Sequence, residues 1–341
     1  MNYPCLKINL LKLENNCRII NDRCARSGIA VVGVSKCVLG DLRIAEVFLK
    51  TGIGIIGDSR LKNLEKLRAH FGKDQPLILL RTPMISEIRK MVKICDISMN
   101  TQIETIKEIS RACSDTNSKH KIVIMVETDD IREGILAQEV LPFCREIHDN
   151  CKNIEIWGIG TNARCISKKK PTADSIDILV NLKKEIMDKL SIDIPVVSGG
   201  NSSVWELIEK NKMPEGVNQV RIGEAILLGH ETSSYNSISG AYGDAFTLEA
   251  EIIEVKKKKS HIYKLILALG VQDVSCENIL CDFPGLKLVS QSSDHTVMAA
   301  ETGKEDKLNL DVGDVLPFNL NYFGLLSCMT SPFIEKKYIE E

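Results

Sequence analysis

Short apolar segments alternate with longer amphipathic segments through residues 29–229, and this alternation is the feature that most constrains the fold. Runs rich in Val, Ile and Leu predict buried parallel strands, and the segments between them predict helices that cover the sheet. The eight predicted strands are residues 30–36, 54–58, 77–82, 96–100, 121–127, 154–161, 194–199 and 219–223. Eight strand–helix units in about 200 residues predict a (β/α)8 TIM barrel. A doubly wound sheet is the structural alternative, but it needs a G-x-G-x-x-G motif after its first strand, which this chain lacks.

The pattern changes near Ser237, where short alternating strands separated by Gly and Pro replace the strand–helix units. Such a sequence pattern is typical of an all-β domain. We therefore predict a barrel over residues 11–235 and a C-terminal β-domain over residues 236–341. Residues 1–10 are expected to add an edge strand to the second domain.

The composition is that of an ordinary globular enzyme, with 44% hydrophobic residues, 26% charged residues and a net charge of −2. Neither a basic excess nor a long apolar run indicates a nucleic-acid or membrane partner. The N-terminus has no charged leader followed by an apolar stretch, so a cytoplasmic location is expected. The twelve cysteines are scattered without a C-x-x-C pair, which favours reduced thiols over a disulfide framework or a metal site.

Lys36 closes the first predicted strand, and the phosphate-binding position of such barrels is expected after strands seven and eight. A lysine kept neutral by burial can form a Schiff base with a carbonyl cofactor, although most lysines at strand ends simply reach water. Residues 199–203 are Gly-Gly-Asn-Ser-Ser and precede a predicted helix, so they supply hydroxyls and backbone amides suited to phosphate. An ordinary helix cap would use the same residues. Together, the lysine and this loop indicate pyridoxal 5′-phosphate.

The chain also resembles the alanine racemase family of fold-type III pyridoxal-phosphate enzymes, most closely its ornithine racemase-like branch. The resemblance covers nearly the whole chain in the family's order. It is carried by Val34-Ser35-Lys36, Gly158-Ile159-Gly160-Thr161-Asn162, Ser198-Gly199-Gly200-Asn201-Ser202-Ser203, Arg221-Ile222-Gly223-Glu224, Ser292-Ser293-Asp294-His295 and Asn321-Tyr322-Phe323-Gly324.

This resemblance implies that Lys36 forms the covalent link to the cofactor. It implies that the phosphate is bound by Ser202 and by the backbone around Gly223 and Glu224, with help from Tyr322 of the second domain.

The resemblance also implies roles near the cofactor ring. Asn162 falls where alanine racemases carry a histidine stacked on the ring, and Arg221 matches the arginine that faces the pyridine nitrogen. A guanidinium does not give up its proton, so that nitrogen would stay unprotonated and proton transfer at Cα would be favoured over side reactions. Arg132 matches the arginine near the substrate carboxylate, and an ion pair in a surface loop is the alternative interpretation.

The chain departs from the family pattern at the positions of two tyrosines, one that binds the phosphate and one that acts as the second acid or base. Gly40 stands where alanine racemases carry a phosphate-binding tyrosine, and the catalytic tyrosine of the β-domain has no clear match, since Tyr263 lies inside an alternating strand. A racemase that uses two bases needs a group on the opposite face of the planar carbon. We predict that Asp294 and His295, supplied by the neighbouring subunit of a homodimer, take that role, with Asp294 the better match to the family. An Asp-His turn without a catalytic role is the alternative.

The loop after the fifth strand is rich in carboxylates, among them Glu127, Asp130 and Glu133. A desolvated ω-ammonium group needs such partners, whereas alanine does not. We therefore predict a racemase that interconverts L- and D-ornithine, or a related basic amino acid, by proton transfer at Cα. The alternatives are an alanine or broad-specificity racemase, a fold-type III decarboxylase or aldolase, and a non-catalytic pyridoxal-phosphate-binding protein.

Overall fold

The computed structural model describes residues 2–128, 130, 132–164, 166–259, 262–301 and 309–340. Contacts between Cα atoms divide the chain into two compact units. One is Asn16–Ala241, and the other joins Met1–Asn15 to Tyr242–Glu341. In the described part of the chain, no helix is both long enough and apolar enough to cross a bilayer.

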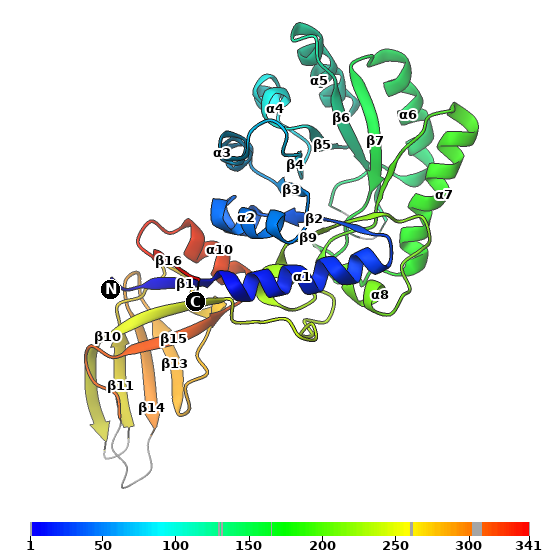
Figure 1. Ribbon diagram of the computed structural model, residues 1–341. Helices are drawn as coiled ribbons and strands as arrows, with labels where there is room; N and C mark the ends of the chain where they lie inside the picture. Colours follow the sequence, from blue (N-terminus) through cyan, green and yellow to red (C-terminus); the bar gives the residue numbers. More distant parts are fainter. Residues whose placement is uncertain are drawn as a thin grey trace. The chain divides into compact units, whose positions relative to one another are not determined.

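The first unit is a closed parallel barrel of eight strands, β2 to β9, in which β2 pairs with both β3 and β9 (Figure 1). This barrel confirms the predicted fold class. The strands are β2 (Ala30–Val34), β3 (Ile55–Asp58), β4 (Leu77–Leu79), β5 (Ile97–Asn100), β6 (His120–Met125), β7 (Ile154–Gly160), β8 (Val196–Ser198) and β9 (Gln219–Ile222). All eight coincide with predicted strands, and six of the eight end one to three residues before the predicted limit.

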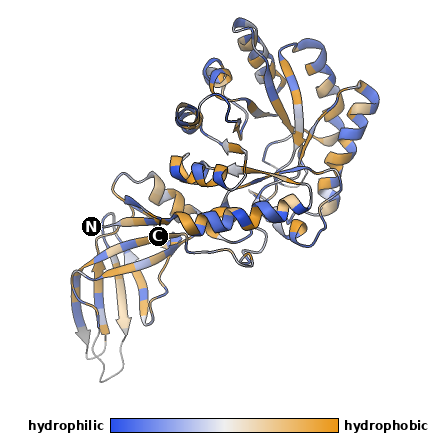
Figure 2. Ribbon diagram, viewed as in Figure 1, coloured by the Kyte–Doolittle hydropathy of each residue, from blue (hydrophilic) through white to orange (hydrophobic). Residues whose placement is uncertain are grey.

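Helices follow the strands and cover the barrel (Figure 1). They are α2 (Leu42–Lys50), α3 (Leu61–Phe71), α4 (Ile88–Ile94), α5 (Ile103–Asp115), α6 (Ala137–Asn150), α7 (Ala173–Leu190), α8 (Trp205–Glu209) and α9 (Glu224–Leu228), with α1 (Leu10–Arg26) preceding the first strand. Hydrophilic and hydrophobic residues share the length of these helices, as expected when one face packs on the sheet (Figure 2).

Alternate residues of each barrel strand face opposite sides, because side chains in a strand have a period of two. Val32, Ile78 and Met99 belong to a buried cluster built only from strand residues, which fills the barrel. Ile56 and Leu79 belong to a second cluster that includes helix residues, so they face outward. The register pairs Arg221 with Val32 and therefore directs Arg221 inward.

The second unit contains an eight-stranded sheet, which matches the predicted β-domain. Its strands are β1 (Cys5–Asn9), β10 (Phe246–Lys259), β11 (Ile262–Leu267), β12 (Ile279–Leu280), β13 (Leu286–Gln291), β14 (Thr296–Glu301), β15 (Val315–Leu320) and β16 (Glu335–Ile339). The described part of this unit also contains the helix α10 (Tyr322–Thr330), which the sequence interpretation did not include.

The N-terminal strand β1 lies inside this sheet. It pairs antiparallel with β10 and parallel with β16, so it has a neighbour on each side. The expectation of an edge strand is therefore wrong in this detail. Its residues Cys5, Leu6 and Ile8 are fully buried, which is the physical reason for an inner position.

Candidate active site

Lys36 lies just beyond the carboxyl end of β2, as the first residue of a short 3-10 helix, η1 (Lys36–Val38). The sequence interpretation placed it at the end of a buried strand, but β2 ends at Val34 and the Lys36 side chain is exposed. The expectation that burial prepares this amine is therefore wrong. The amine is instead presented at the barrel mouth, where a carbonyl compound can reach it.

The backbone before Lys36 is held by the end of the neighbouring strand. The Ser35 N–H donates to the Gly57 carbonyl at 2.9 Å, and the Ser35 hydroxyl donates to Asp58 Oδ2 at 2.8 Å. Asp58 is fully buried and its other oxygen accepts from the Arg60 N–H at 2.8 Å. Burial raises the pKa of the Asp58 carboxyl, while these hydrogen bonds oppose the rise. The chain around Lys36 is thus fixed even though the lysine side chain is exposed.

Arg221 lies inside the barrel and joins the ends of three strands. Its guanidinium donates to Ser198 Oγ at 2.5 Å, to the Thr161 carbonyl at 2.5 Å and to Asn162 Oδ1 at 2.8 Å. The Ser198 hydroxyl in turn donates to Gln219 Oε1 at 3.0 Å. A buried charge is costly unless hydrogen bonds satisfy it, and these contacts also set the plane of the guanidinium.

The loop after β8 is fastened to the loop after β7. The Asn201 side chain accepts from the Ser203 N–H and donates to the Ala163 carbonyl, both at 2.9 Å. Ser202 is buried, and its hydroxyl accepts from the Ala225 N–H at the start of α9 at 3.2 Å. Small polar side chains and the first amides of α9 are therefore gathered here, and their binding of a phosphate stays a prediction.

Gly223 brings this loop close to the strand that leads to Lys36. A Cβ at Gly223 would lie 2.9 Å from the Val34 carbonyl oxygen, a distance that no side chain tolerates. Only glycine permits this approach of the two backbones. Gly223 also caps α9 without a side chain, and Glu224 is the first residue of that helix. Glu224 Oε1 lies 3.2 Å from His230 Nε2, which fixes its side chain.

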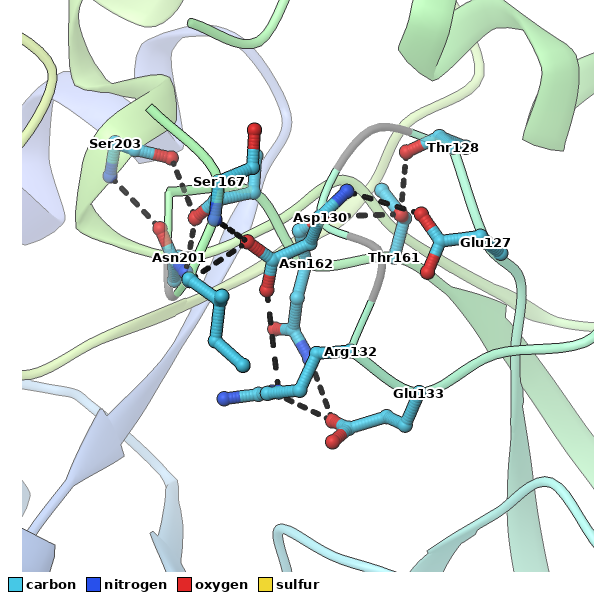
Figure 3. A network of polar contacts seen from close by, with 12 residues as sticks. Glu127, Thr128, Asp130, Arg132, Glu133, Thr161, Asn162, Ser167, Asn201 and Ser203 are labelled. Carbon is cyan, nitrogen blue, oxygen red and sulfur yellow. Dashed lines mark hydrogen bonds and ion pairs between the residues drawn. The ribbon is translucent and has the colours of Figure 1, made fainter. Parts of the chain in front are cut away.

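Figure 3 shows that the loop after β6 joins the same polar region through Asn162. The Asn162 amide donates to Glu133 Oε1 at 3.2 Å, and Arg132 Nη2 lies 2.5 Å from the same oxygen. Arg132 Nε is 3.9 Å from Asp130 Oδ2. Glu127 Oε1 accepts from the Asp130 N–H at 2.9 Å. The structure thus connects Arg132, Asp130 and Glu127, three predicted substrate-site residues, to Asn162.

Tyr322, Asp294 and His295 belong to the sheet unit rather than to the barrel. Tyr322 is the first residue of α10, where the Asn321 side chain caps the helix by accepting from the Gly324 N–H at 2.9 Å. Asp294 Oδ1 lies 3.0 Å from His295 Nδ1, in a turn between β13 and β14. The hydrogen bond from His295 lowers the pKa of the Asp294 carboxyl below its usual value, and the Ser292 hydroxyl contributes.

Three residues outside the predicted set of site residues take part in this polar region, although Glu133 belongs to the carboxylate-rich loop that was expected to suit an ω-ammonium group. Glu133 links Arg132 to Asn162, Ser198 holds Arg221, and Asp58 holds the segment before Lys36. Ser198 and Asp58 each stand at the carboxyl end of a predicted strand. This position was the feature of the sequence that could have identified them as site residues. Within the described ranges, no group of three or more His, Cys, Asp or Glu side chains is placed to hold a metal ion.

Comparison with known protein families identifies the family of this chain. Residues 8–231 match the model of the family described as alanine racemase, N-terminal domain. The chain belongs to the alanine racemase family. This finding confirms the resemblance inferred from the motifs at the strand ends.

Two curated members of the alanine racemase family are similar over their full length. The lysine racemase of Thermotoga maritima is 35% identical, and the match covers 99% of each chain. The ornithine racemase of Acetoanaerobium sticklandii is 32% identical, covering 99% of this chain and all of the relative. Both relatives are named racemases, in agreement with the predicted reaction.

Solved structures show the same fold at lower identity. The alanine racemase of Clostridium difficile 630 superposes with a TM-score of 0.77 at 17% identity and covers 100% of this chain and 97% of its own. A D-threo-3-hydroxyaspartate dehydratase from Delftia superposes with a TM-score of 0.75 at 16% identity, covering 97% and 93%. The fold therefore serves more than one reaction, so the fold alone does not select the chemistry.

Proposed function

We propose that this protein is a pyridoxal-phosphate-dependent racemase that interconverts the L and D forms of a basic amino acid, with ornithine or lysine as substrate. The observation that carries the proposal is the full-length similarity to a lysine racemase and an ornithine racemase. The barrel residues that the motifs predicted support it, because they gather at the carboxyl ends of the strands, where such barrels carry their chemistry.

The donor set at this end of the barrel fits pyridoxal 5′-phosphate. Lys36 offers an exposed primary amine for an aldehyde, and it stands two residues beyond Val34, which Gly223 approaches. The buried Ser202 hydroxyl and the first backbone amides of α9 suit a phosphate group. Arg221 suits the ring nitrogen, because a permanently protonated guanidinium donates to that atom without protonating it. Asn162, bonded to Arg221, would lie beside the ring, and Tyr322 would add a phosphate contact.

Racemisation requires removal of the Cα proton and its return from the other side. When bound, pyridoxal 5′-phosphate supplies an electron-withdrawing ring that makes the Cα–H bond of an attached amino acid acidic. We assign Lys36 Nζ to move the proton on one face of Cα. Arg132 would orient the substrate through its α-carboxylate, because a guanidinium binds a carboxylate with two parallel hydrogen bonds.

For the opposite face, we assign the Asp294–His295 pair of a neighbouring subunit, so the working form would be a homodimer. Asp294 Oδ1 lies 3.0 Å from His295 Nδ1, and this hydrogen bond lowers the pKa of the Asp294 carboxyl. The two side chains would act together to move the proton on this face. The eleven cysteines in the described part of the chain are free thiols, which supports a cytoplasmic location.

The test follows the optical activity of single enantiomers of ornithine, lysine, alanine and serine after addition of the protein loaded with the cofactor. We expect the signal of ornithine or lysine to decay to zero from either enantiomer. Lys36→Ala should abolish both this decay and the absorbance of cofactor bound through a Schiff base. Lys62→Ala, on the exposed side of α3, is the control and should leave both unchanged.

Other outcomes of this assay would select the other functions. Rapid decay with alanine alone would indicate an alanine racemase, and decay with all four substrates a broad-specificity enzyme. Net loss of the amino acid would indicate a decarboxylase, aldolase or dehydratase. Cofactor binding with no change in any amino acid would indicate a binding protein without catalysis.

A further inference from the structure

The carboxylates of the loop after β6 differ in what they contact. Glu127 Oε1 accepts from the Asp130 N–H at 2.9 Å. Asp130 is 3% exposed, and its Oδ1 accepts from the N–H groups of Ile166 and Ser167 at 3.0 and 3.3 Å. Asp130 therefore holds the loops after β6 and β7 together, and Glu127 fixes the backbone at Asp130 within the first of these loops. A role of these two carboxylates in substrate binding stays a prediction.

Glu133 is placed differently. One third of its side chain is exposed, and within the described residues its hydrogen bonds go to side chains, Arg132 Nη2 at 2.5 Å and Asn162 Nδ2 at 3.2 Å. Asn162 accepts in turn from the buried guanidinium of Arg221 at 2.8 Å. Figure 3 shows the Glu133 carboxylate beside Asn162 and Arg132. Through Asn162 and Arg221, this carboxylate is linked to the interior of the barrel while one third of its side chain stays exposed.

We infer that Glu133 is the residue that selects a basic amino acid, by binding the ω-ammonium group of the substrate. This inference rests on the proposed function. In the absence of substrate, Glu133 pairs with Arg132. A basic amino acid brings a carboxylate for Arg132 and an ammonium group for Glu133. Arg132 then exchanges the Glu133 carboxylate for the substrate carboxylate, and Glu133 exchanges the Arg132 guanidinium for the substrate ammonium group.

A neutral amino acid cannot complete this exchange. Alanine or norvaline offers Arg132 a carboxylate but offers Glu133 no cation, so binding would leave Glu133 with only the Asn162 amide among these partners. A charge deprived of its partner in a partly buried place is costly, which makes the neutral substrate a poor competitor. Asp130 stays 3.9 Å from Arg132 Nε and keeps the loop in place during the exchange.

The test compares the wild type and Glu133→Gln, both loaded with cofactor, on ornithine, lysine and norvaline. Norvaline matches the carbon chain of ornithine but lacks the ω-amino group. We expect the variant to lose about 10- to 100-fold in kcat/KM for the basic substrates, mainly through KM, since one charged hydrogen bond is removed. The value for norvaline should stay the same or rise. Glu139→Gln, an exposed carboxylate in the first turn of α6, is the matched control.

Calorimetric titration with ornithine and norvaline gives a second measurement that does not depend on turnover. Glu133→Gln should weaken ornithine binding and leave norvaline binding unchanged, and Glu133→Asp should restore part of the difference. An equal loss for basic and neutral substrates would overturn the inference while the racemase proposal stands. Failure of the wild type to racemise any basic amino acid would instead overturn the proposed function itself.

Discussion

Arg221 shows how single residues build the polar interior of the barrel. Its guanidinium donates to the Ser198 hydroxyl, to the carbonyls of Ser198 and Thr161 and to the Asn162 amide oxygen, all of them neutral groups. Neutral acceptors satisfy the N–H groups without cancelling the positive charge.

We predict that Ser198→Ala lowers the free energy of unfolding by about 1–3 kcal/mol, because the buried guanidinium loses one acceptor. The same change should reduce kcat, since the plane of the Arg221 guanidinium is no longer fixed. Urea unfolding and racemase kinetics measure the two effects. Ser114→Ala, at an exposed position of α5, should change the stability by less than about 0.5 kcal/mol. An equal effect of both changes would contradict the role of Ser198.

At the scale of elements, the turn that carries Asp294 and His295 is packed against the segment that follows β11. The Val271 N–H donates to the Ser292 carbonyl, and the Gln272 N–H donates to the Ser293 carbonyl, both at 3.0 Å. Gly270 is the point of closest approach, because a Cβ there would lie 2.2 Å from the Ser293 carbonyl oxygen. Gly270 thus helps to set the position of the turn, although it has no acidic or basic side chain.

Gly270→Ala should therefore displace the Asp294–His295 turn, since the added methyl group overlaps the turn backbone. We expect racemase activity to fall at least tenfold while the absorbance of the Lys36-bound cofactor is retained. Gly54→Ala, at a glycine with open space around its Cβ position, is the control and should behave like the wild type. Full activity of Gly270→Ala would argue against a catalytic role for the turn.

At the scale of the whole molecule, a buried histidine makes stability depend on pH. His120 begins β6 and is 2% exposed, with its Nε2 2.9 Å from Ser98 Oγ. Burial lowers the pKa of His120 from 6.5 to about 4. Between these two values the unfolded chain binds a proton that the folded protein does not. Acid therefore favours unfolding in this window.

The free energy of unfolding should fall by up to about 3 kcal/mol from this residue as the pH decreases from 6.5 to 4. Urea unfolding of the wild type and His120→Gln at pH 7, 5.5 and about 4 isolates the contribution, because other titrating groups are common to both proteins. The stability difference between the two should shrink or reverse toward acid. A difference that is constant with pH would contradict the assignment to His120.

The sequence by itself determined the eight barrel strands and the sheet of the second unit. It also singled out Lys36, Ser202 and Arg221 as candidate cofactor-binding residues. These features depend on the spacing of apolar residues and on turn residues, and both patterns can be recognised within short segments of the sequence. Strand ends were less exact, since the transition from β2 to η1 depends on how Ser35 contacts Asp58 across the sheet.

Only the tertiary structure decided which polar side chains meet. Arg221 and Asn162 are separated by 59 residues in the chain, and closure of the barrel brings them to 2.8 Å. The fold also brings Asp130 to the backbone amides of Ile166 and Ser167 and Glu133 to the Asn162 amide, although the two carboxylates look alike in the sequence. The physical reason is that hydrogen-bond partners are fixed by distance and direction in space, which local sequence does not encode.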